Sequence, residues 1–247
     1  MSRPSPAEHE ALCGLTRAHL DANVVATLSN GSRTRADILL VEYAGRRLVV
    51  KDYAARDWAY RTLLGRWHVR REVAAYRDLQ GVPGIPAFCH QIDAYALAVP
   101  YVEGKSCAQC GPGELPDGFY VKLRGIAEAF HERGIAHCDL KKNTNILLTP
   151  SGDPVILDLA SVLRRDSWFW PLRRFKGWLF RHFANDDLRA AAKLKRQLDP
   201  DRLTTEEIRH LEQRAPAERV FRWLRRRLLP VVKRLTTRAR PEQPPDR

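Results

Sequence analysis

The residues in this sequence that are best suited to chemistry lie between positions 137 and 158. Residues 137–148 are HCDLKKNTNILL, so a carboxylate at Asp139 and an amide at Asn145 precede a short apolar run; a second carboxylate, Asp158, ends the next apolar run. Carboxylate and amide oxygens are ligands that Mg²⁺ accepts readily. Phosphoryl transfer needs two such ligands for the metal and a separate carboxylate near the nucleophile, because the phosphates are already anionic. The pattern therefore favours Mg²⁺-assisted phosphoryl transfer.

This segment resembles the catalytic loop and metal-binding segment of the protein-kinase superfamily. The resemblance implies that Asp139 is the catalytic base and that Asn145 and Asp158 bind Mg²⁺ on the phosphates of ATP. The gap of six positions from Asp139 to Asn145 is one longer than the usual pattern. Asn143 therefore competes for the metal role, although Asn145 fits better because it directly precedes the apolar run. Taken alone, the segment could arise by chance with Asp139 capping a turn, but four further matches follow in the expected order.

The first of these matches are a lysine and a glutamate upstream. Lys51 ends the apolar stretch LVVK, and the resemblance implies that it contacts the α- and β-phosphates of ATP. Glu72 lies on the helix expected next and is placed to orient Lys51. Each has an ordinary alternative, as a surface lysine at a strand end and a solvated helix residue. Asp158 itself, in the position of the family's Asp-Phe-Gly aspartate, is a further match.

The remaining match is the stretch LAVPYVEG at residues 97–104, which resembles the hinge that binds adenine. Val99 would be the gatekeeper, the Pro100 carbonyl would accept a hydrogen bond from adenine, and the Val102 amide would donate one. The match to the glycine-rich loop that covers the phosphates is weaker. Only Gly31, followed by Ser32, lies near its expected place, so the cradle for phosphates is thin.

Other departures separate the chain from ordinary Ser/Thr protein kinases. Cys138 replaces the usual arginine, Leu159 and Ala160 replace Phe-Gly, and no Ala-Pro-Glu follows. A peptide-docking activation segment is therefore not expected. The likeness moves toward compact bacterial kinases, namely the lipopolysaccharide kinases that phosphorylate Kdo or core heptose, and their RIO-like relatives. It covers roughly residues 24–165.

The elements around these residues predict an α+β protein with a protein-kinase-like, bilobal fold. A short leading helix is expected within residues 1–20. The expected strands and helices then follow in this order: strands at 24–28, 36–43 and 47–50, the last two joined as a hairpin by Ala44–Gly45, a helix at 69–79, strands at 88–92 and 94–99, a helix at 120–133, and strands at 146–148 and 155–157. The rest is predicted to be helical. We expect an N-lobe with hinge over 1–103, a C-lobe over 104–235 and a disordered tail over 236–247.

Composition and charge bound the setting of the chain. Its 247 residues suit one or two domains, and the five cysteines, together with a polar start lacking a signal peptide, indicate reduced thiols in the cytoplasm. We read the CxxC at Cys107 and Cys110 as incidental. The formal net charge of +13 is uneven: residues 1–161 carry 19 basic and 18 acidic side chains, and residues 162–247 carry 23 and 11.

The basic last third is also rich in aromatic residues. Trp168, Trp170, Trp178 and Trp223 are interleaved with arginine and lysine, a pattern that suits the interface of an anionic membrane. The alternative is that these aromatics pack the helical lobe while the arginines face water. Nucleic acid is a third interpretation, because aromatic rings stack on bases, and it is the one we least expect.

The sequence therefore predicts an ATP- and Mg²⁺-dependent kinase whose acceptor is a hydroxyl. The preferred acceptor is a sugar of a membrane-linked glycolipid, with the protein peripheral on the inner face of the cytoplasmic membrane. One alternative is an atypical, RIO-like Ser/Thr protein kinase with a protein hydroxyl as acceptor. Another is a membrane-associated pseudokinase scaffold, which the thin glycine loop permits but the retained Lys, Glu, Asp, Asn and Asp set argues against.

Overall fold

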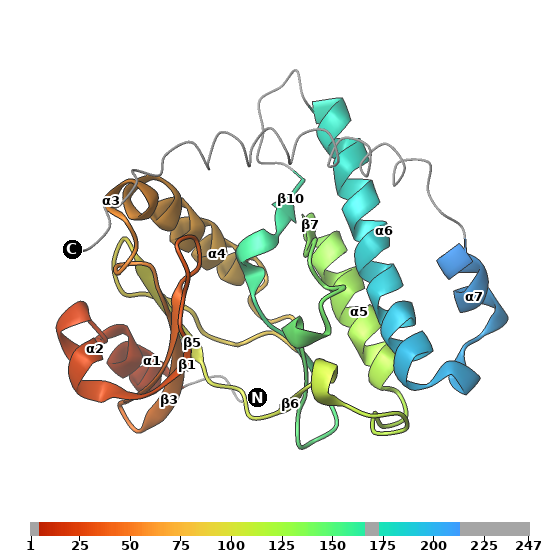
Figure 1. The fold of residues 1–247 in the computed structure, drawn as a ribbon, viewed down its shortest axis with the longest axis horizontal. Helices are drawn as coiled ribbons and strands as arrows, with labels where there is room; N and C mark the ends of the chain where they lie inside the picture. The colour runs from red at the N-terminus through yellow and green to blue at the C-terminus, as the bar shows by residue number, and fades with distance from the viewer. Residues whose placement is uncertain (1–4, 166–172, 213–247) are drawn as a thin grey trace, which may run out of the picture. The chain divides into compact units, whose positions relative to one another are not determined.

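The computed structural model describes residues 5–165 and 173–212, and it divides the chain into two compact units. The first unit spans Met1–Leu203 and contains a sheet-rich lobe and a helical lobe (Figure 1). In the second unit, Thr204–Arg247, the described element is helix α7 (Thr205–Glu212). The α+β, bilobal organisation predicted from the sequence is thus present in the first unit. Within the described residues, no helix is long and apolar enough to cross a lipid bilayer.

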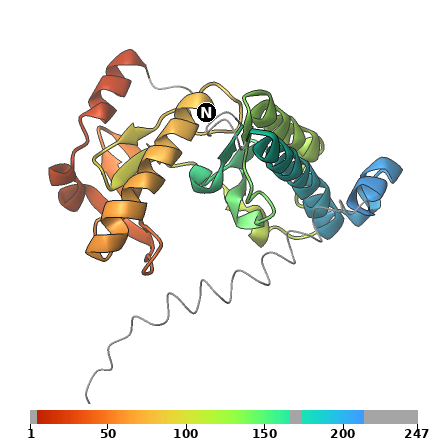
Figure 2. The same cartoon turned by 90° about the horizontal axis from the view of Figure 1, so that it is seen from above.

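The N-terminal lobe is built on a five-stranded antiparallel sheet in the order β1-β2-β3-β5-β4. Its strands are β1 (Val24–Ser29), β2 (Asp37–Tyr43), β3 (Arg46–Asp52), β4 (His90–Gln91) and β5 (Ala96–Pro100). Helices α1 (Pro6–Cys13) and α2 (Arg17–Asn23) precede the sheet, and α3 (Trp58–Tyr60), the π-helix η1 (Arg61–Gly65) and α4 (Arg66–Asp78) link β3 to β4. Seen from above, α4 lies over the sheet (Figure 2).

The two faces of the sheet pack against different helices. On β3, Leu48 and Val50 are buried in one cluster with leucines of the leading helices, whereas Val49 packs in the other cluster, with Val69 of α4. This follows from the period of two along a strand, which sends successive side chains to opposite faces. Lys51, two positions after Val49, is therefore directed toward α4.

The start of the chain differs from the prediction. A single short helix was expected over residues 1–20, but the chain forms α1 and α2, which are separated at Gly14–Thr16. Each helix has its own capping box, formed by Ser5 with Glu8 and by Thr16 with His19. The second capping box, at Thr16, therefore starts a new helix and divides the segment in two.

The predicted hairpin between β2 and β3 is confirmed. Tyr43 pairs with Arg46 across a two-residue turn, in which Ala44 and Gly45 have φ of 50° and 70°. Positive φ at both central residues is the geometry of a type I′ turn, whose twist matches that of the strands. The turn keeps β3 in register with β2 and so fixes the position of Lys51.

The C-terminal lobe is organised around two long helices, α5 (Phe119–Glu132) and α6 (Arg173–Leu198). Its strands are β6 (Lys105–Ser106), β7 (Ile135–Ala136), β8 (Ile146–Leu148), β9 (Pro154–Ile156) and β10 (Leu163–Arg164), which form the sheets β6-β8-β9 and β10-β7. Phe119, Leu123, Ile126 and Phe130 of α5 are buried, as the predicted amphipathic pattern requires. The pattern predicted α4 and α5 to within three residues at each end. It missed α3 with η1, and also β6, β7 and β10. The predicted tail, 236–247, lies outside the described residues.

Candidate active site

A buried lysine joins the two lobes. The Nζ of Lys51 on β3 donates to Oε1 of Glu72 on α4 at 2.6 Å and to Oδ1 of Asp158, after β9, at 2.8 Å. The Glu72 side chain is fully buried, that of Lys51 is 13% exposed and that of Asp158 is 43% exposed. Glu72 and Asp158 lie 21 and 107 positions after Lys51 in the chain, and both contact its ammonium group.

In this cluster, burial and ion pairing shift the pKa values of the three side chains in opposite directions. Burial alone would lower the pKa of Lys51, but the charges of Glu72 and Asp158 raise it well above its usual value. Burial raises the pKa of Glu72, against the effect of Lys51. For Asp158 burial acts in the raising direction, but Lys51 outweighs it and the pKa falls below its usual range. Lys51 therefore stays cationic at neutral pH, and Asp158 stays anionic with its outer face open.

Asp158 has an unusual backbone. Its φ of 62° and ψ of 75° lie in the left-handed region, and its Oδ1 also accepts from the amide of Ala160 at 3.4 Å. A non-glycine residue pays roughly 1–2 kcal/mol for this conformation. Leu159, which follows in the position of the family's phenylalanine, is fully buried in the main core. The departure from Asp-Phe-Gly therefore still supplies an apolar anchor that holds Asp158 in place.

The catalytic-loop residues form a second group. The Asp139 carboxylate pairs with Lys142, and the Asp139 backbone carbonyl accepts from Nδ2 of Asn145 at 3.1 Å. The amide of Leu157 donates to the backbone carbonyl of Asn145 at 2.8 Å. These bonds tie the loop to the residue that directly precedes Asp158. Asp139, Asn145 and Asp158 thus belong to one hydrogen-bonded unit.

The two candidate asparagines differ in what they contact. Asn145 is buried, and its Nδ2 is used by Asp139, which leaves Oδ1 as an acceptor. The amide of Asn143 instead donates to Oε1 of Gln197 on α6 at 2.9 Å. Both side chains keep Oδ1, so what separates them is their place: Asn145 is held beside Asp139, whereas Asn143 is held by Gln197 of α6.

The loop is held by a residue that the sequence did not single out. Asp187 of α6 is buried and accepts from the backbone amides of His137, at 2.6 Å, and Cys138, at 3.1 Å. Its Oδ2 also lies 3.3 Å from Nε2 of His131. In Asn185–Asp187 nothing distinguishes this residue from a solvated helix carboxylate; its only signal is that it lies on the helix face that also buries Ala190, Ala191 and Leu194.

His137 and Cys138 complete the start of the loop. Nε2 of His137 is 3.1 Å from the carbonyl of Leu157, and the ring is buried beside Phe130. Cys138, which replaces the family's arginine, has a φ of 67°, and burial raises the pKa of its thiol to about 12. This cysteine is therefore a neutral packing residue, whereas an arginine would carry a charge.

The predicted hinge follows β5. Val99 is buried on the face toward α4, and Leu48 of β3 pairs with Pro100. The Tyr101 amide is engaged by the carbonyl of Arg47 at 2.9 Å, so the next amide along the chain is that of Val102. The Pro100 carbonyl and the Val102 amide, which were predicted to bind adenine, therefore lie on either side of the Tyr101 amide, which is already hydrogen-bonded.

The predicted phosphate cradle is occupied by internal bonds. The Gly31 amide donates to Oδ1 of Asp37 at 2.7 Å, and the Ser32 carbonyl accepts from Arg56 at 2.6 Å. A Cβ at Gly31 would come within 2.4 Å of the Arg35 carbonyl, so glycine is required by packing. Gly31 therefore shapes the loop, and its amide does not point to an open phosphate site.

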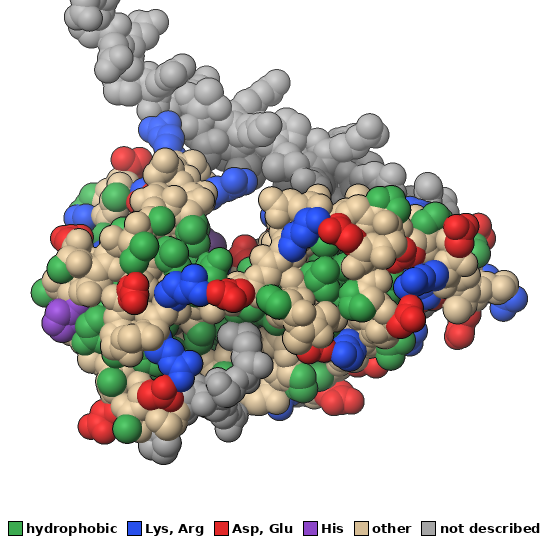
Figure 3. Space-filling view, turned by 90° about the horizontal axis from the view of Figure 1, so that it is seen from below, with side chains coloured by type: hydrophobic (Ala, Val, Ile, Leu, Met, Phe, Trp, Pro, Cys, Tyr) green, Lys and Arg blue, Asp and Glu red, His purple; other side chains and the backbone are tan. Residues whose placement is uncertain are grey.

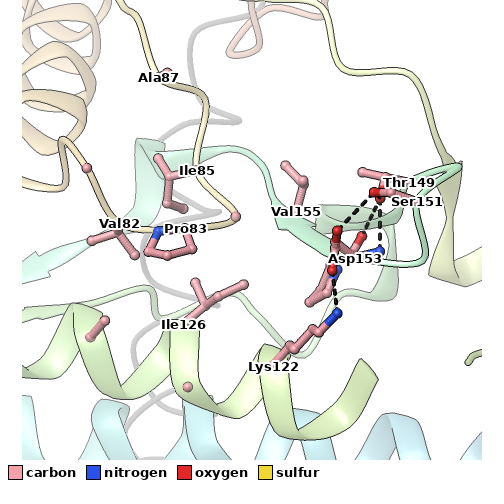
Figure 4. A pocket seen from close by; sticks show the side chains of 15 residues that line it. Val82, Pro83, Ile85, Ala87, Lys122, Ile126, Thr149, Ser151, Asp153 and Val155 are labelled. Atoms are coloured by element: carbon pink, nitrogen blue, oxygen red, sulfur yellow. Dashed lines mark hydrogen bonds and ion pairs between the residues drawn. The ribbon is translucent and has the colours of Figure 1, made fainter. Parts of the chain in front are cut away.

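A pocket of about 690 Å³ lies elsewhere, between the turn after α4, helix α5 and the β8–β9 turn (Figure 4). Its polar side chains pair with one another: Lys122 donates to Asp153 at 2.6 Å, and Ser151 lies 2.9 Å from both Asp153 and Thr149. None of the predicted site residues lines it. We therefore assign no chemistry to this pocket.

The basic aromatic third is only partly described. Phe180 is buried against His131, and Trp178 is half-buried and stacks on His182 at 6.1 Å. Phe180 therefore packs within the helical lobe, as one of the three interpretations proposed, whereas Trp178 contacts a residue of its own helix. Trp168, Trp170 and Trp223 lie outside the described residues. On the face drawn in Figure 3, acidic, basic and apolar side chains are interspersed.

We predict that Asp187→Ala destabilises the protein by leaving two buried amides without an acceptor. Each such loss costs about 1–3 kcal/mol, which for a chain of this size corresponds to a drop in Tm of at least about 4 °C. The matched control is Asp186→Ala, since the neighbouring carboxylate lies 3.9 Å from His182 at a half-buried position. The measurement is the Tm of both variants by thermal unfolding. Equal decreases in Tm would show that Asp187 does not anchor the loop.

Comparison with known proteins gives similarity of fold only. No protein-family model matches the chain, and no curated protein matches it. Among solved structures it is similar to the Rio2 kinase from Chaetomium thermophilum, with 18% identity and a TM-score of 0.48 over 79% of this chain and 72% of that chain. It is also similar to the Rio2 kinase-ADP/Mg²⁺-phosphoaspartate complex from the same organism. The identity there is 18% and the TM-score 0.48, over 80% of this chain and 75% of that chain. The sheet order and the bilobal α+β arrangement seen in this chain are those of a protein-kinase-like fold.

Proposed function

We propose that this protein is an ATP-dependent phosphotransferase that acts on a hydroxyl group. The observation that carries the proposal is the buried Lys51 ammonium, held at 2.6 Å from Glu72 and 2.8 Å from Asp158. A buried charge is costly unless it is paired, and here an additional carboxylate is left partly exposed beside the pair. Clusters of titratable groups with perturbed pKa values are candidates for functional sites.

The residues present fit Mg²⁺ and a nucleotide. Asp158 uses Oδ1 for Lys51, which leaves Oδ2 for a cation, and Asn145 retains Oδ1. Over residues 5–165 and 173–212, no group of three or more His, Cys, Asp or Glu side chains could hold a metal. This agrees with nucleotide-linked Mg²⁺, which takes one or two protein carboxylates and completes its shell with phosphates and water. Bound there, Mg²⁺ would neutralise charge on the phosphates.

The chain's own groups then divide the work of transfer. Lys51 stays cationic and would contact the phosphates, while Glu72 fixes its orientation. Asp139, whose side chain is 16% exposed, would accept and orient the proton of the acceptor hydroxyl. Lys142, its ion-pair partner, is 59% exposed and can move away or toward the transferred group as substrate enters. Positioning and electrostatic stabilisation of this kind account for most catalysis of phosphoryl transfer.

For the acceptor, we propose a sugar hydroxyl of a membrane-linked glycolipid, which makes the protein peripheral on the cytoplasmic membrane. The support is the sequence likeness to lipopolysaccharide kinases and the lack of an Ala-Pro-Glu after Asp158. A RIO-like protein kinase is the second candidate, because the departures at Cys138 and Leu159 fit RIO-like kinases as well as lipopolysaccharide kinases. The pseudokinase alternative gains from the engaged Gly31 amide, but a scaffold has no use for the Lys51 cluster.

We expect Asp158→Asn and Lys51→Met each to lower the rate of ATP-dependent phosphoryl transfer at least ~10²-fold, because one removes a metal ligand and the other a phosphate contact. Asp153→Asn and Lys122→Met, an exposed ion pair, are the matched controls. Lys51→Met leaves the buried Glu72 unpaired, so it is also combined with Glu72→Gln and its unfolding is measured. Near-normal turnover in folded Asp158→Asn and Lys51→Met variants would refute the kinase assignment.

Replacing the two asparagines separates their roles. We expect Asn145→Ala to raise the Mg²⁺ concentration required for half-maximal activity well above that of Asn143→Ala, because the Asn145 side chain is held beside Asp139, whereas that of Asn143 is held by Gln197 of α6. Turnover is measured across a Mg²⁺ titration at saturating ATP. The opposite order of the two variants would assign the metal to Asn143.

The acceptor class is tested directly with γ-labelled ATP. We expect label to enter glycolipid when the protein is incubated with a total membrane-lipid extract, and expect Asp139→Asn to abolish it because the base is lost. A peptide array tested in parallel provides the comparison. Label in peptides but not in lipid would favour the RIO-like alternative.

A further inference from the structure

An unusual apolar surface lies at the start of the helix that carries Glu72. Trp58 is 72% exposed, Leu63 73%, Leu64 48% and Trp67 49%. Of the nine large apolar side chains that are exposed in the described part of the chain, these four fall within ten consecutive residues. Single exposed apolar residues need no explanation, but a group of this kind marks an interaction surface.

The same segment is basic. Residues 56–71 contain five arginines and one acidic residue, Asp57. Three of the arginines face inward. Arg56 pairs with Asp37, Arg61 donates to the Ala54 carbonyl at 3.1 Å, and Arg71 donates to the Val162 carbonyl.

The other two arginines, Arg66 and Arg70, make no ion pair or hydrogen bond within the described residues. Arg66 and Arg70 are at i and i+4 of α4, with Trp67 next to Arg66, and Leu63 lies in the π-helical turn η1 that leads into α4. We call these four residues, with Trp58 and Leu64 beside them, the α4 face. It combines apolar and cationic groups that have no partner of opposite sign nearby.

We propose that the α4 face docks on an anionic membrane surface. Tryptophan rings lie well at the level of lipid headgroups, leucines reach the acyl boundary, and arginines meet lipid phosphates. The charge of the face fits this partner, since the segment offers almost no acidic group. This site differs from the basic aromatic third that the sequence suggested, where Phe180 packs against His131 of α5 and Trp178 stacks on His182 of its own helix.

The location gives the surface a rigid base. Arg71 donates to Val162, and Arg164 donates to the carbonyl of Ala74 at 2.8 Å, so α4 is held to the segment that follows Asp158. Trp67 is five residues before Glu72, about 7.5 Å along the helix axis. The membrane would therefore contact the same helix that orients Lys51. Binding itself does not depend on the proposed phosphoryl transfer.

The experiment is co-sedimentation of the full chain with phosphatidylcholine vesicles, with and without phosphatidylglycerol, at low and high salt. We expect binding only with phosphatidylglycerol, and weaker binding at high salt because the attraction is screened. Arg66→Ala/Arg70→Ala should lower the partition coefficient roughly 30-fold, given the usual contribution of each basic residue near an anionic leaflet. Leu63→Ser/Trp67→Ser should lower it by at least about tenfold.

Matched controls keep the test specific. Arg133→Ala/Lys193→Ala removes the same charge from exposed positions in the C-terminal lobe, and Val121→Ser removes an apolar side chain that is 76% exposed. Both should bind within about twofold of wild type. Asp139→Asn, whose partner Lys142 is exposed, should bind vesicles normally, so failure of the kinase proposal and failure of this one are distinguishable. Absence of binding to anionic vesicles, or equal loss in the α4-face variants and the controls, would overturn the proposal.

Discussion

The structure depends on one constraint, which is that a fully buried Glu72 must be matched by a cation. An unpaired carboxylate in an apolar interior would cost several kcal/mol or lose its charge. Lys51 supplies the cation, and it reaches Glu72 because β3 alternates: Leu48 and Val50 enter the cluster beneath the leading helices, and Lys51 faces α4. Helix α4 must then lie over that face of the sheet, and the segment after β9 must bring Asp158 to the same ammonium.

The loop proposed to be catalytic is fixed by a second polar anchor. Asp187 accepts from the amides of His137 and Cys138, while Asn145 and Leu157 join the loop to Asp158. Asp139 and Asp158 come from different loops: the Asp139 carbonyl accepts from Asn145, and the Asp158 carboxylate accepts from Lys51 and the amide of Ala160. Hydrogen bonds of this kind restrain both loops to one geometry. The site is therefore preorganised before any ligand binds.

Much of the fold followed from periodicity. The apolar spacing on α4 and α5 and the Ala44–Gly45 turn predicted those elements to within a few residues, because burial of one face and positive φ leave clear signals. The order of Lys51, Glu72, Asp139 and Asp158 also predicted which side chains to examine. The roles assigned to them remain proposals.

Other features left no signal of that kind. Asp187 acts on a loop fifty residues before it, and a carboxylate in a helix looks the same whether it faces water or a buried amide. The membrane pattern was assigned to the last third because its net charge is high, yet the exposed tryptophans of the α4 face stand in a short basic segment within residues 1–161, where basic and acidic side chains nearly balance. Exposure is set by tertiary packing, which local sequence does not record.

The central claim is that the Lys51 cluster is a Mg²⁺-nucleotide site. Calorimetric titration of the wild-type chain with ATP, in the presence of Mg²⁺ and in its absence, tests it most directly. The account predicts binding of one ATP per chain that strengthens markedly with Mg²⁺, and loss of that strengthening in Asp158→Asn. Absence of nucleotide binding, or affinity that is the same with and without Mg²⁺ in wild type, would contradict it.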